Sequence, residues 1–498
     1  MRSPWRLSPP SSPYVPNPYV SVYFRPVSGL LSTETRGWGW VEYRRPVLPV
    51  VTPDEMREID ASATEPLDVL IERAGAAVTR AAVRMLGGSY GKRVVVIAGK
   101  GNNGADGRVA ARRLSGRGVH VQVLDAVHLP ERLPACDLVI DAAYGIGFRG
   151  AWSPPDTAGT PVLAVDIPTG VDARTGECPT GVMAAAHTVT FAALKPGLLF
   201  PPGSGLVGSL EVAEIGLDVS RAHIHLVEGA DVARWVPRRD TDAHKWRSAV
   251  WVIGGSPTMF GAARLATAAA QRAGAGMVYL STPGAGVDPL APTEAVSQPL
   301  PSSGWASEVL DRSERLHAFV VGPGLGRLDV TATEVKLFVA QTERPVVIDG
   351  DGLFALAWGD REVGALLRRR SAPTVLTPHD GEYALLTGHR PGGDRIDAAR
   401  RLATDTGAVV LLKGPATVVA NPDGSALVVT TGDERLATAG TGDVLSGVIG
   451  ALLAQGLPAM EAAAAAAWIH GMAAQRGPAR GLVASDVIGC IPAVLESL

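Results

Sequence analysis

The chain has 498 residues, of which 46% are hydrophobic and 19% charged, and its formal net charge is -3 at pH 7. This length is too great for one ordinary core, so we expect two domains plus extensions. The small net charge argues against nucleic acid or an anionic membrane as the main partner. No run of about 18 apolar residues, the length needed to span a bilayer, is present.

The three cysteines, Cys136, Cys178 and Cys490, are far apart and form no CxxC pair. This spacing argues against a disulfide framework and against a cysteine zinc site. It is typical of a protein in a reducing compartment, so we expect a cytoplasmic location.

Residues 1–48 differ in composition from the rest, with a proline- and aromatic-rich stretch, SPPSSPYVPNPYVSVYF. No strand or helix period is sustained there, and no secretory signal is recognisable. We expect a disordered extension, or an upstream start that the cell does not use. A transit peptide is the alternative, because arginines outnumber acids in this segment.

From about residue 49 the pattern becomes regular, beginning with a helix capped by Thr52 in TPDEMREIDASA. A buried strand, a Gly/Asn loop and a helix follow in KRVVVIAGKGNNGADGRVAARRL, and CDLVIDAAYGIG and PVLAVDIPTGVD add two more strands. Short Val/Ile strands alternating with Ala-rich helices predict a parallel sheet covered on both faces. We place the first domain at 49–222, a linker at 223–240 and a second α/β domain at 241–498.

Three strand ends of the first domain carry polar residues, at 101–107, 141–150 and 166–170. Ligands of open α/β sheets bind at the carboxyl ends of strands, so these loops are expected to form one site. Asn103, Asp141 and Thr169 could hold a cation through oxygen atoms. Asp166 follows an apolar strand, where burial would raise its pKa toward use in proton transfer. Each loop alone is also compatible with a helix cap or a turn.

In the second domain, LATAGTGDVLSGVIGALL places Asp443 between a Gly-Thr-Gly turn and an apolar helix. Such a turn favours anions, and an acid beside it could take a proton from a hydroxyl during phosphoryl transfer. Lys413 ends a strand and could hold a nucleotide phosphate. His379, Asp349 and Asp351 also end strands and are expected to line the same crevice, although His379 alone could be an ordinary loop histidine.

The motifs GNNGADG, DAAYGIG and DIPTGVDARTGE resemble the NAD(P)H-hydrate epimerase domain, also called the YjeF N-terminal domain, over about residues 50–220. The resemblance implies a Rossmann-like αβα sandwich that holds K⁺ on Asn103, Asp141 and Thr169. It also implies that the hydrated nicotinamide nucleotide contacts Asn102, Asn103, Gly104, Ala105, Asp106, Gly145, Ile146, Gly147, Phe148, Arg149, Gly150 and Asp166. Three positions depart from the family pattern: Ala105 replaces Gly, Ile146 replaces Thr and Thr169 replaces Ser.

The second series, including GGS, GPGLG, TPH, KGPAT and AGTGD, resembles the ribokinase-like superfamily and, within it, the ADP-dependent NAD(P)H-hydrate dehydratase domain. The resemblance implies a second αβα domain with Mg²⁺ at its site. It implies contacts of Ala262, Gly326, His379 and Asp443 with the hydrated nucleotide. The adenine nucleotide would contact Lys413, Gly414, Pro415, Ala416, Thr417 and Gly442. HKWRSA at 244–249 departs from the usual HKGxxG.

Together the two resemblances imply a cofactor-repair enzyme that acts on NADHX and NADPHX. One domain would interconvert the R and S hydrates, and the other would dehydrate the S form with ADP, giving AMP and phosphate. Asp166 and Asp443 are the expected catalytic residues, and a homo-oligomer is expected. The alternatives are a vitamin-precursor kinase, because such kinases share the GTGD turn, and a front domain that acts only as a binding scaffold.

Overall fold

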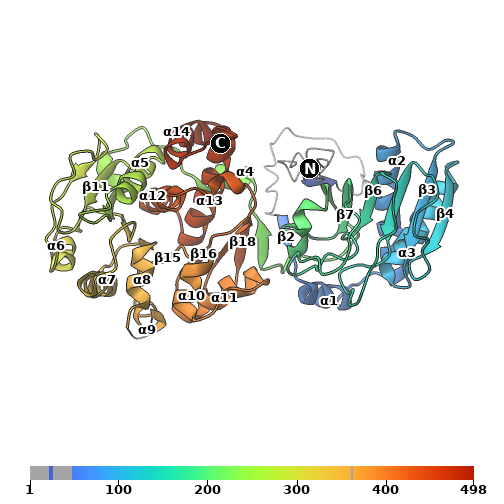
Figure 1. The fold of residues 1–498 in the computed structure, drawn as a ribbon, viewed down its shortest axis with the longest axis horizontal. Helices are drawn as coiled ribbons and strands as arrows, with labels where there is room; N and C mark the ends of the chain where they lie inside the picture. The colour runs from blue at the N-terminus through green and yellow to red at the C-terminus, as the bar shows by residue number, and fades with distance from the viewer. Residues whose placement is uncertain (1–21, 26–47, 360–362) are drawn as a thin grey trace, which may run out of the picture. The chain divides into compact units, whose positions relative to one another are not determined.

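The computed structural model describes residues 22–25, 48–359 and 363–498. These residues divide into two compact units (Figure 1). The first comprises 22–25 and 57–218, and the second comprises 48–56 and 219–498. Two α/β domains are therefore present, as the sequence predicts.

The first unit is built on a seven-stranded sheet in the order β1-β8-β7-β6-β5-β3-β4, with every described pairing parallel. Parallel strands need crossovers, and the chain runs back along the sheet between successive strands. The strands are β1 (Val22–Arg25), β3 (Arg93–Ala98), β4 (His120–Asp125), β5 (Leu138–Ala142), β6 (Val162–Val165), β7 (His187–Phe191) and β8 (Ser209–Ala213).

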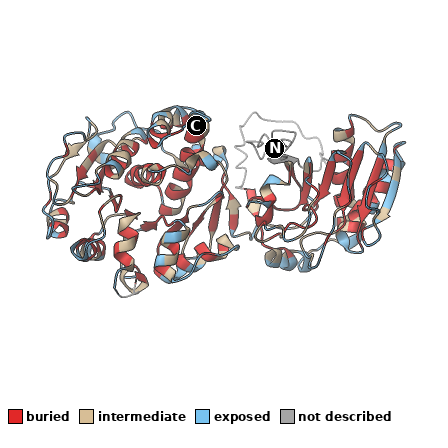
Figure 2. Cartoon of the chain, viewed as in Figure 1, coloured by how far each residue is buried: buried red, intermediate tan, exposed pale blue. Residues whose placement is uncertain are grey.

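Helices α2 (Leu67–Leu86) and α3 (Asn102–Ser115) share one hydrophobic core on one face of this sheet. Because side chains alternate along a strand, Val94 and Val96 face these helices, while Val95 and Ile97 face a second core. That second core is completed by residues of the irregular segments, such as Trp152 and Met183. Figure 2 shows how completely the central strands are buried.

The second unit contains an eleven-stranded sheet in the order β12-β11-β10-β13-β14-β15-β16-β17-β18-β9-β2. Pairing is parallel from β12 to β16, antiparallel through β17 and β18, parallel at β9 and antiparallel at β2. The strands are β2 (Leu48–Val50), β9 (Ile224–Leu226), β10 (Ala249–Ile253), β11 (Met277–Ser281), β12 (Val296–Ser297), β13 (Ala318–Val321), β14 (Val346–Ile348), β15 (Thr374–Leu376), β16 (Val409–Leu412), β17 (Thr417–Ala420) and β18 (Ala426–Val429).

One hydrophobic core of this unit lies between the sheet and the Ala-rich helices α5, α12, α13 and α14. The helix α13 packs closely because a run of six alanines, 462–467, is buried along it. The helices are α4 (Gly229–Trp235), α5 (Gly261–Arg272), α6 (Trp305–Asp311), α7 (Asp329–Gln341), α8 (Asp351–Ala357), α9 (Val363–Leu367), α10 (Asp380–Thr387), α11 (Arg395–Thr406), α12 (Thr441–Ala454), α13 (Ala459–Arg476) and α14 (Ala484–Glu496).

The expected linker at 223–240 is not a simple connection, since it contains β9 and α4. Residues of β9 pair with β18 on one side and with β2 on the other, so this segment is part of the second sheet, next to its edge strand β2. The predicted extension at 1–48 lies mostly outside the described residues, but Val22–Arg25 forms β1 at the edge of the first sheet. The short strands β1, β2 and β9 therefore complete the two sheets. Local composition did not predict these strands.

The predicted start of the first helix is confirmed at α1 (Pro53–Ala61). The Thr52 hydroxyl accepts from the backbone N–H of Glu55, and the Glu55 carboxylate accepts from the N–H of Thr52. This reciprocal pair satisfies two backbone donors at the helix start.

Candidate functional site

The loop after β3 enters α3 through close backbone contacts. A Cβ on Gly104 would lie 1.9 Å from the carbonyl oxygen of Gly99, so only glycine fits there. Asn102, Asn103, Gly104 and Ala105 form the first turn of α3, which begins after Gly101. The loop therefore presents helix N–H groups at the carboxyl end of the sheet, where an anionic ligand would be favoured.

Of the three residues predicted to hold a cation, Asp141 and Thr169 are hydrogen-bonded to each other, and Asn103 lies next to the neighbouring loop at Gly145. Thr169 donates to Asp141 through both its hydroxyl (2.7 Å) and its backbone N–H (2.9 Å). The Thr169 hydroxyl also lies 3.2 Å from the carbonyl of Tyr144, and Gly145 packs against Asn103. Both side-chain polar atoms of Asn103 are buried and have no hydrogen-bond partner among the described residues. Asn103 thus contributes two buried polar atoms that have no hydrogen-bond partner in the described part of the chain.

Asp166 is held by a residue that the sequence analysis missed, Lys195. The Lys195 ammonium is 2.6 Å from the carboxylate of Asp166 and also donates to the Thr190 hydroxyl and the Phe191 carbonyl, both at 2.9 Å. The Lys195 side chain is only 1% exposed. The signal was the lysine in FAALKPG, which follows β7 as Asp166 follows β6.

Asp106, from α3, has a contrasting environment. It is 6% exposed, and no described residue donates a hydrogen bond to its carboxyl group. Burial, with the nearby charge of Asp166, raises the pKa of Asp106 to about 8. At neutral pH the first site therefore combines a protonated carboxyl with a carboxylate paired to lysine.

The loop at 145–150 borders this cluster and is anchored by aromatic packing. Phe148 stacks on Tyr144 with ring centroids 4.4 Å apart, and Trp152 meets Tyr144 edge to face. Gly147, Arg149 and Gly150 are exposed, and Ile146 is half-buried. This leaves much of the loop accessible to a ligand.

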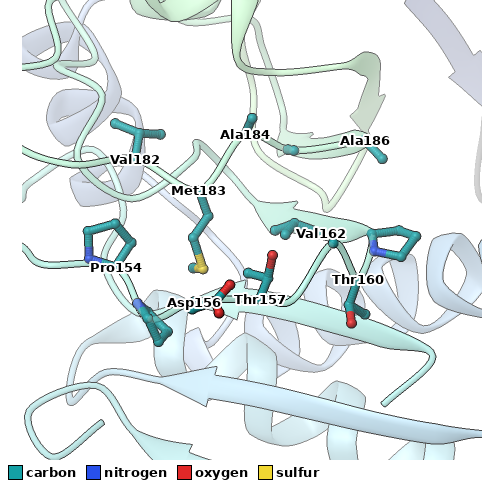
Figure 3. Close-up of a pocket in the computed structure, with 13 residues that line it drawn as sticks. Pro154, Asp156, Thr157, Thr160, Val162, Val182, Met183, Ala184 and Ala186 are labelled. Carbon is teal, nitrogen blue, oxygen red and sulfur yellow. The ribbon is translucent and has the colours of Figure 1, made fainter. Parts of the chain in front are cut away.

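A cavity of about 540 Å³ in the same domain is a different feature. It is lined by Thr160 and Val162 at the amino end of β6 and by Ala184–Ala186 before β7 (Figure 3). The predicted site residues follow the carboxyl ends of these strands. The cavity therefore lies away from the residues that the sequence singles out.

In the second unit, the Gly-Thr-Gly turn forms the start of α12, with Gly440 in a left-handed conformation (φ 90°). A Cβ on Gly440 would lie 2.5 Å from Leu265. The Thr441 hydroxyl donates to its own loop, to the carbonyls of Leu436 and Thr438, and so shapes the turn. A helix start of this kind would favour an anion, so anion binding at α12 stays a prediction.

Asp443 is half-buried in the first turn of α12. Burial raises the pKa of Asp443 to about 7, the charge of Asp349 adds to this rise, and Lys413 partly opposes it. A carboxyl with this pKa is poised to accept a proton near neutral pH.

Lys413 is not a free phosphate ligand, because its ammonium binds Asp349 at 2.7 Å and lies 3.7 Å from Glu382. Burial opposes the charge of Asp349, but Lys413, Ser446 and Thr377 outweigh it and lower the pKa of Asp349. Asp349 is 2% exposed, so it is buried beneath the predicted site and does not line it. A Cβ on Gly442 would lie 3.4 Å from the Lys413 ammonium, which places this charge next to the turn.

Other predicted residues are arranged around the same strand ends. His379 caps α10, where its Nδ1 accepts from the N–H groups of Gly381 and Glu382, while the ring remains 60% exposed. Asp351 accepts from the N–H of Gly326 (2.9 Å) and thereby fixes the GPGLG loop. Ala262 lies in the first turn of α5.

Where HKWRSA replaces the family's glycines, Trp246 packs edge to face against Tyr279. The segment forms a short 3-10 helix at Lys245–Ser248, begun by His244, whose side chain accepts from the N–H of Trp246. At this departure from the family pattern, the loop is therefore packed against β11 through Trp246 and Tyr279.

His470 of α13 was also not anticipated. It is buried, its Nε2 has no hydrogen-bond partner among the described residues, and burial lowers its pKa to about 4. The histidine is therefore neutral. The signal in the sequence was WIHG, a polar residue inside an apolar, Ala-rich helix.

Comparison with known proteins matches both units to families. Residues 250–491 match the NAD(P)H-hydrate dehydratase family, and residues 67–133 and 125–197 match the YjeF-related protein N-terminus family. In the solved structures, the ADP/ATP-dependent NAD(P)H-hydrate dehydratase from Bacillus subtilis is 29% identical, covers 54% of this chain and 97% of its own, and superposes with a TM-score of 0.46.

Relatives match both domains together. The bifunctional NAD(P)H-hydrate repair enzyme of Moorella thermoacetica is 36% identical over 518 residues, covering 90% of this chain and 97% of the relative. The corresponding enzyme of Mycobacterium leprae is 40% identical over 456 residues, covering 84% of this chain and 92% of the relative. The chain therefore belongs to the family of bifunctional NAD(P)H-hydrate repair enzymes, which join an epimerase domain to a dehydratase domain.

Proposed function

We propose that the first domain interconverts the R and S epimers of NADHX and NADPHX, and that the second dehydrates the S epimer with ADP. The observation that carries the second activity is Asp443, a carboxyl with a pKa of about 7 at an anion-binding helix start. Family membership supplies the substrate, which the residues alone do not identify.

In the dehydratase site, Asp443 takes the proton of the ring hydroxyl while that oxygen attacks the terminal phosphoryl group of ADP. The new P–O bond forms as the bond to AMP breaks, and the amides at the start of α12 stabilise the transferring group. Loss of phosphate from the ring carbon, with loss of the neighbouring ring proton, then restores the double bond. Lys413, held by Asp349, contributes positive charge beside Gly442.

For the contacts, we assign the hydrated nucleotide of this domain to Ala262, Gly326, His379 and Asp443. The adenine nucleotide is assigned to residues 413–417 and Gly442. Gly414 and Pro415 are exposed, whereas Ala416 is buried, so the loop would contact a nucleotide chiefly through its first residues and backbone.

In the epimerase site, Asp106 donates its proton to the departing hydroxyl, and water leaves as the ring nitrogen shares its electron pair with the carbon. Water then adds to the opposite face and loses its proton to a carboxylate, Asp166 or Asp106. No oxidation state changes, and water is conserved. Asp166, paired with Lys195, supplies the negative charge that favours the cationic ring.

The first site fits the expected K⁺. Asn103 offers a buried carbonyl oxygen that has no partner, while Asp141 is fully buried with a pKa raised by burial. A cation held by Asn103, Asp141 and Thr169 would satisfy the amide oxygen and compensate the buried charge. It would supply fixed positive charge at the strand ends.

A protein-built Mg²⁺ site is not supported in the same way. Within residues 48–359 and 363–498, no three His, Cys, Asp or Glu side chains group together to hold a metal. We propose that Mg²⁺ is carried by the nucleotide phosphates, as this ion keeps most of its water and needs few protein ligands.

The test is to supply the purified S hydrate of NADH with ADP and to follow recovery of the reduced-nicotinamide absorbance and formation of AMP. Recovery with one AMP per NADH is the expected result. No recovery, together with phosphorylation of a thiazole or pyrimidine alcohol, would establish the vitamin-kinase alternative. Supplying the R hydrate tests the first domain, since recovery then requires epimerisation. The homo-oligomer and the cytoplasmic location remain predictions.

No helix within the described part of the chain is long and apolar enough to cross a membrane.

A further inference from the structure

The start of α11 lies between two segments that the proposed function assigns to different ligands. The Asp394 side chain accepts from the N–H of Asp397 and caps this helix, which fixes the first residue, Arg395. One guanidinium nitrogen of Arg395 donates to the Asp380 carboxylate at 2.9 Å. Another donates to the backbone carbonyl of Lys413 at 2.6 Å. Asp380 adjoins His379, and Lys413 begins the nucleotide loop.

The guanidinium is enclosed at this junction. Its side chain is 13% exposed, and its Nε is buried without a hydrogen-bond partner among the described residues. A Cβ on Gly414 would lie 2.7 Å from one guanidinium nitrogen and 3.0 Å from the central carbon. The nucleotide loop thus rests directly on Arg395, and glycine at 414 is what allows this approach.

Arginine is suited to this junction because its planar fork presents several N–H groups in fixed directions. A lysine ammonium at the same place would be a point charge with a different reach, so it could not reproduce both contacts. The carbonyl that Arg395 holds belongs to Lys413, whose ammonium in turn binds Asp349 beside Gly442. One side chain therefore sets both the α10 start and the loop that carries Lys413.

We propose that Arg395 is a positioning residue of the dehydratase site, which aligns the His379 segment with the Lys413–Thr417 loop so that hydroxyl and phosphoryl group meet at Asp443. This inference rests on the proposed function. Arg395 touches neither ligand; it acts through Asp380 and the Lys413 carbonyl. The sequence gives no sign of it, because Arg395 is one of several arginines in DRIDAARRLA.

The experiment compares Arg395→Met with Arg401→Met in the full-length chain. Arg401 lies on the same helix, is 58% exposed and pairs with Asp397, so it is a matched control. With Arg395→Met we expect KM for both ADP and the S hydrate to rise about tenfold, the loss that a charged hydrogen bond typically causes. Arg401→Met should match the wild type, and epimerase activity of both variants should be unchanged.

Asp380→Ala removes the contact of Arg395 with α10 but keeps its contact with the Lys413 carbonyl, so it separates the two positioning roles. We expect it to raise KM for the hydrate while leaving KM for ADP within about twofold, whereas Arg395→Lys should improve on Arg395→Met for one ligand only. Calorimetric titration with ADP checks the loop contact independently of turnover, and a thermal melt reports folding.

A folded Arg395→Met protein with wild-type KM values for both ligands would overturn the inference. So would an equal fall in kcat for both domains with a lowered Tm, since that would mean general destabilisation. If the wild-type protein lacks dehydratase activity, the proposed function itself is wrong. Assay of the wild type alone distinguishes this outcome from failure of the inference about Arg395.

Discussion

The two candidate sites lie on unrelated sheets but have the same electrostatic arrangement. In the first, Lys195 pairs with Asp166, and the pKa of Asp106 is raised to about 8. In the second, Lys413 pairs with Asp349, and the pKa of Asp443 is raised to about 7. In each, a lysine forms an ion pair with one acid, and burial together with the charge of that acid raises the pKa of the other carboxyl.

The difference lies in which carboxyl of the pair is more exposed. Asp166 is half-buried and its lysine partner is fully enclosed, whereas Asp349 is enclosed and the perturbed Asp443 is half-buried at a helix start. In the second site the paired acid therefore supports the reactive one. In the first, both acids belong to the proposed contact set. An ion-paired acid therefore supports the reactive carboxyl in the second site, whereas in the first it belongs to the proposed reactive set.

The largest expected effect is that of Asp443→Asn, which removes the proposed base. The rate of dehydration should fall about 100- to 10,000-fold, the usual contribution of general-base catalysis. Epimerase activity, followed by chromatographic separation of the two hydrates, should be retained. A dehydratase rate within tenfold of wild type would show that Asp443 does not act as the base.

Removal of Lys195 or Lys413 tests how much each lysine–aspartate ion pair contributes to the free energy of unfolding. Lys195→Met leaves Asp166 without its buried partner and should lower the free energy of unfolding by about 3–5 kcal/mol. Lys413→Met should cost less, because that side chain is 21% exposed. Denaturant unfolding measures both. The double variant Lys195→Met with Asp166→Asn should recover part of the loss; no recovery would indicate that the ion pair is not its cause.

The pH dependence should differ in sign between the two activities. The dehydratase needs ionised Asp443, so kcat/KM should fall about tenfold per unit as the pH drops below about 7. The epimerase needs protonated Asp106, so kcat/KM should fall as the pH rises above about 8. Asp106→Asn removes the proposed proton donor, so it should slow the epimerase, and the remaining rate should lack the alkaline limb. If kcat/KM changed with pH in the same direction for both activities, the proposed roles of Asp443 and Asp106 would be contradicted.

The smallest effect concerns the cation. Because the first site contains an amide oxygen without a partner, the epimerase should be stimulated by K⁺. Asn103→Ala should raise the K⁺ concentration needed by about tenfold or more. Thr169→Ser keeps the hydroxyl and serves as the control. Replacement of K⁺ by a large organic cation, with activity unchanged, would count against a cation site.

Much of the arrangement could be predicted from local sequence. Val/Ile strands bounded by glycine loops predicted both α/β domains, and the polar residues at strand ends predicted the region where Asp141 and Thr169 are hydrogen-bonded. Edge elements were harder. β2 and β9 are three residues each; β9 pairs with β18, which lies about 200 residues away in the sequence, and β2 pairs with β9.

The sequence by itself determined the fold class and the position of Asp443, because strand period, glycine turns and helix starts are local properties. Only the tertiary structure decided which charges meet. Lys195 reaches Asp166 across neighbouring strands, Lys413 is turned toward Asp349, and Arg395 joins two loops. The raised pKa values of Asp106 and Asp443 also come from the tertiary structure, because they depend on burial and on the charges of Asp166 and Asp349, which lie close in space but far apart in the chain.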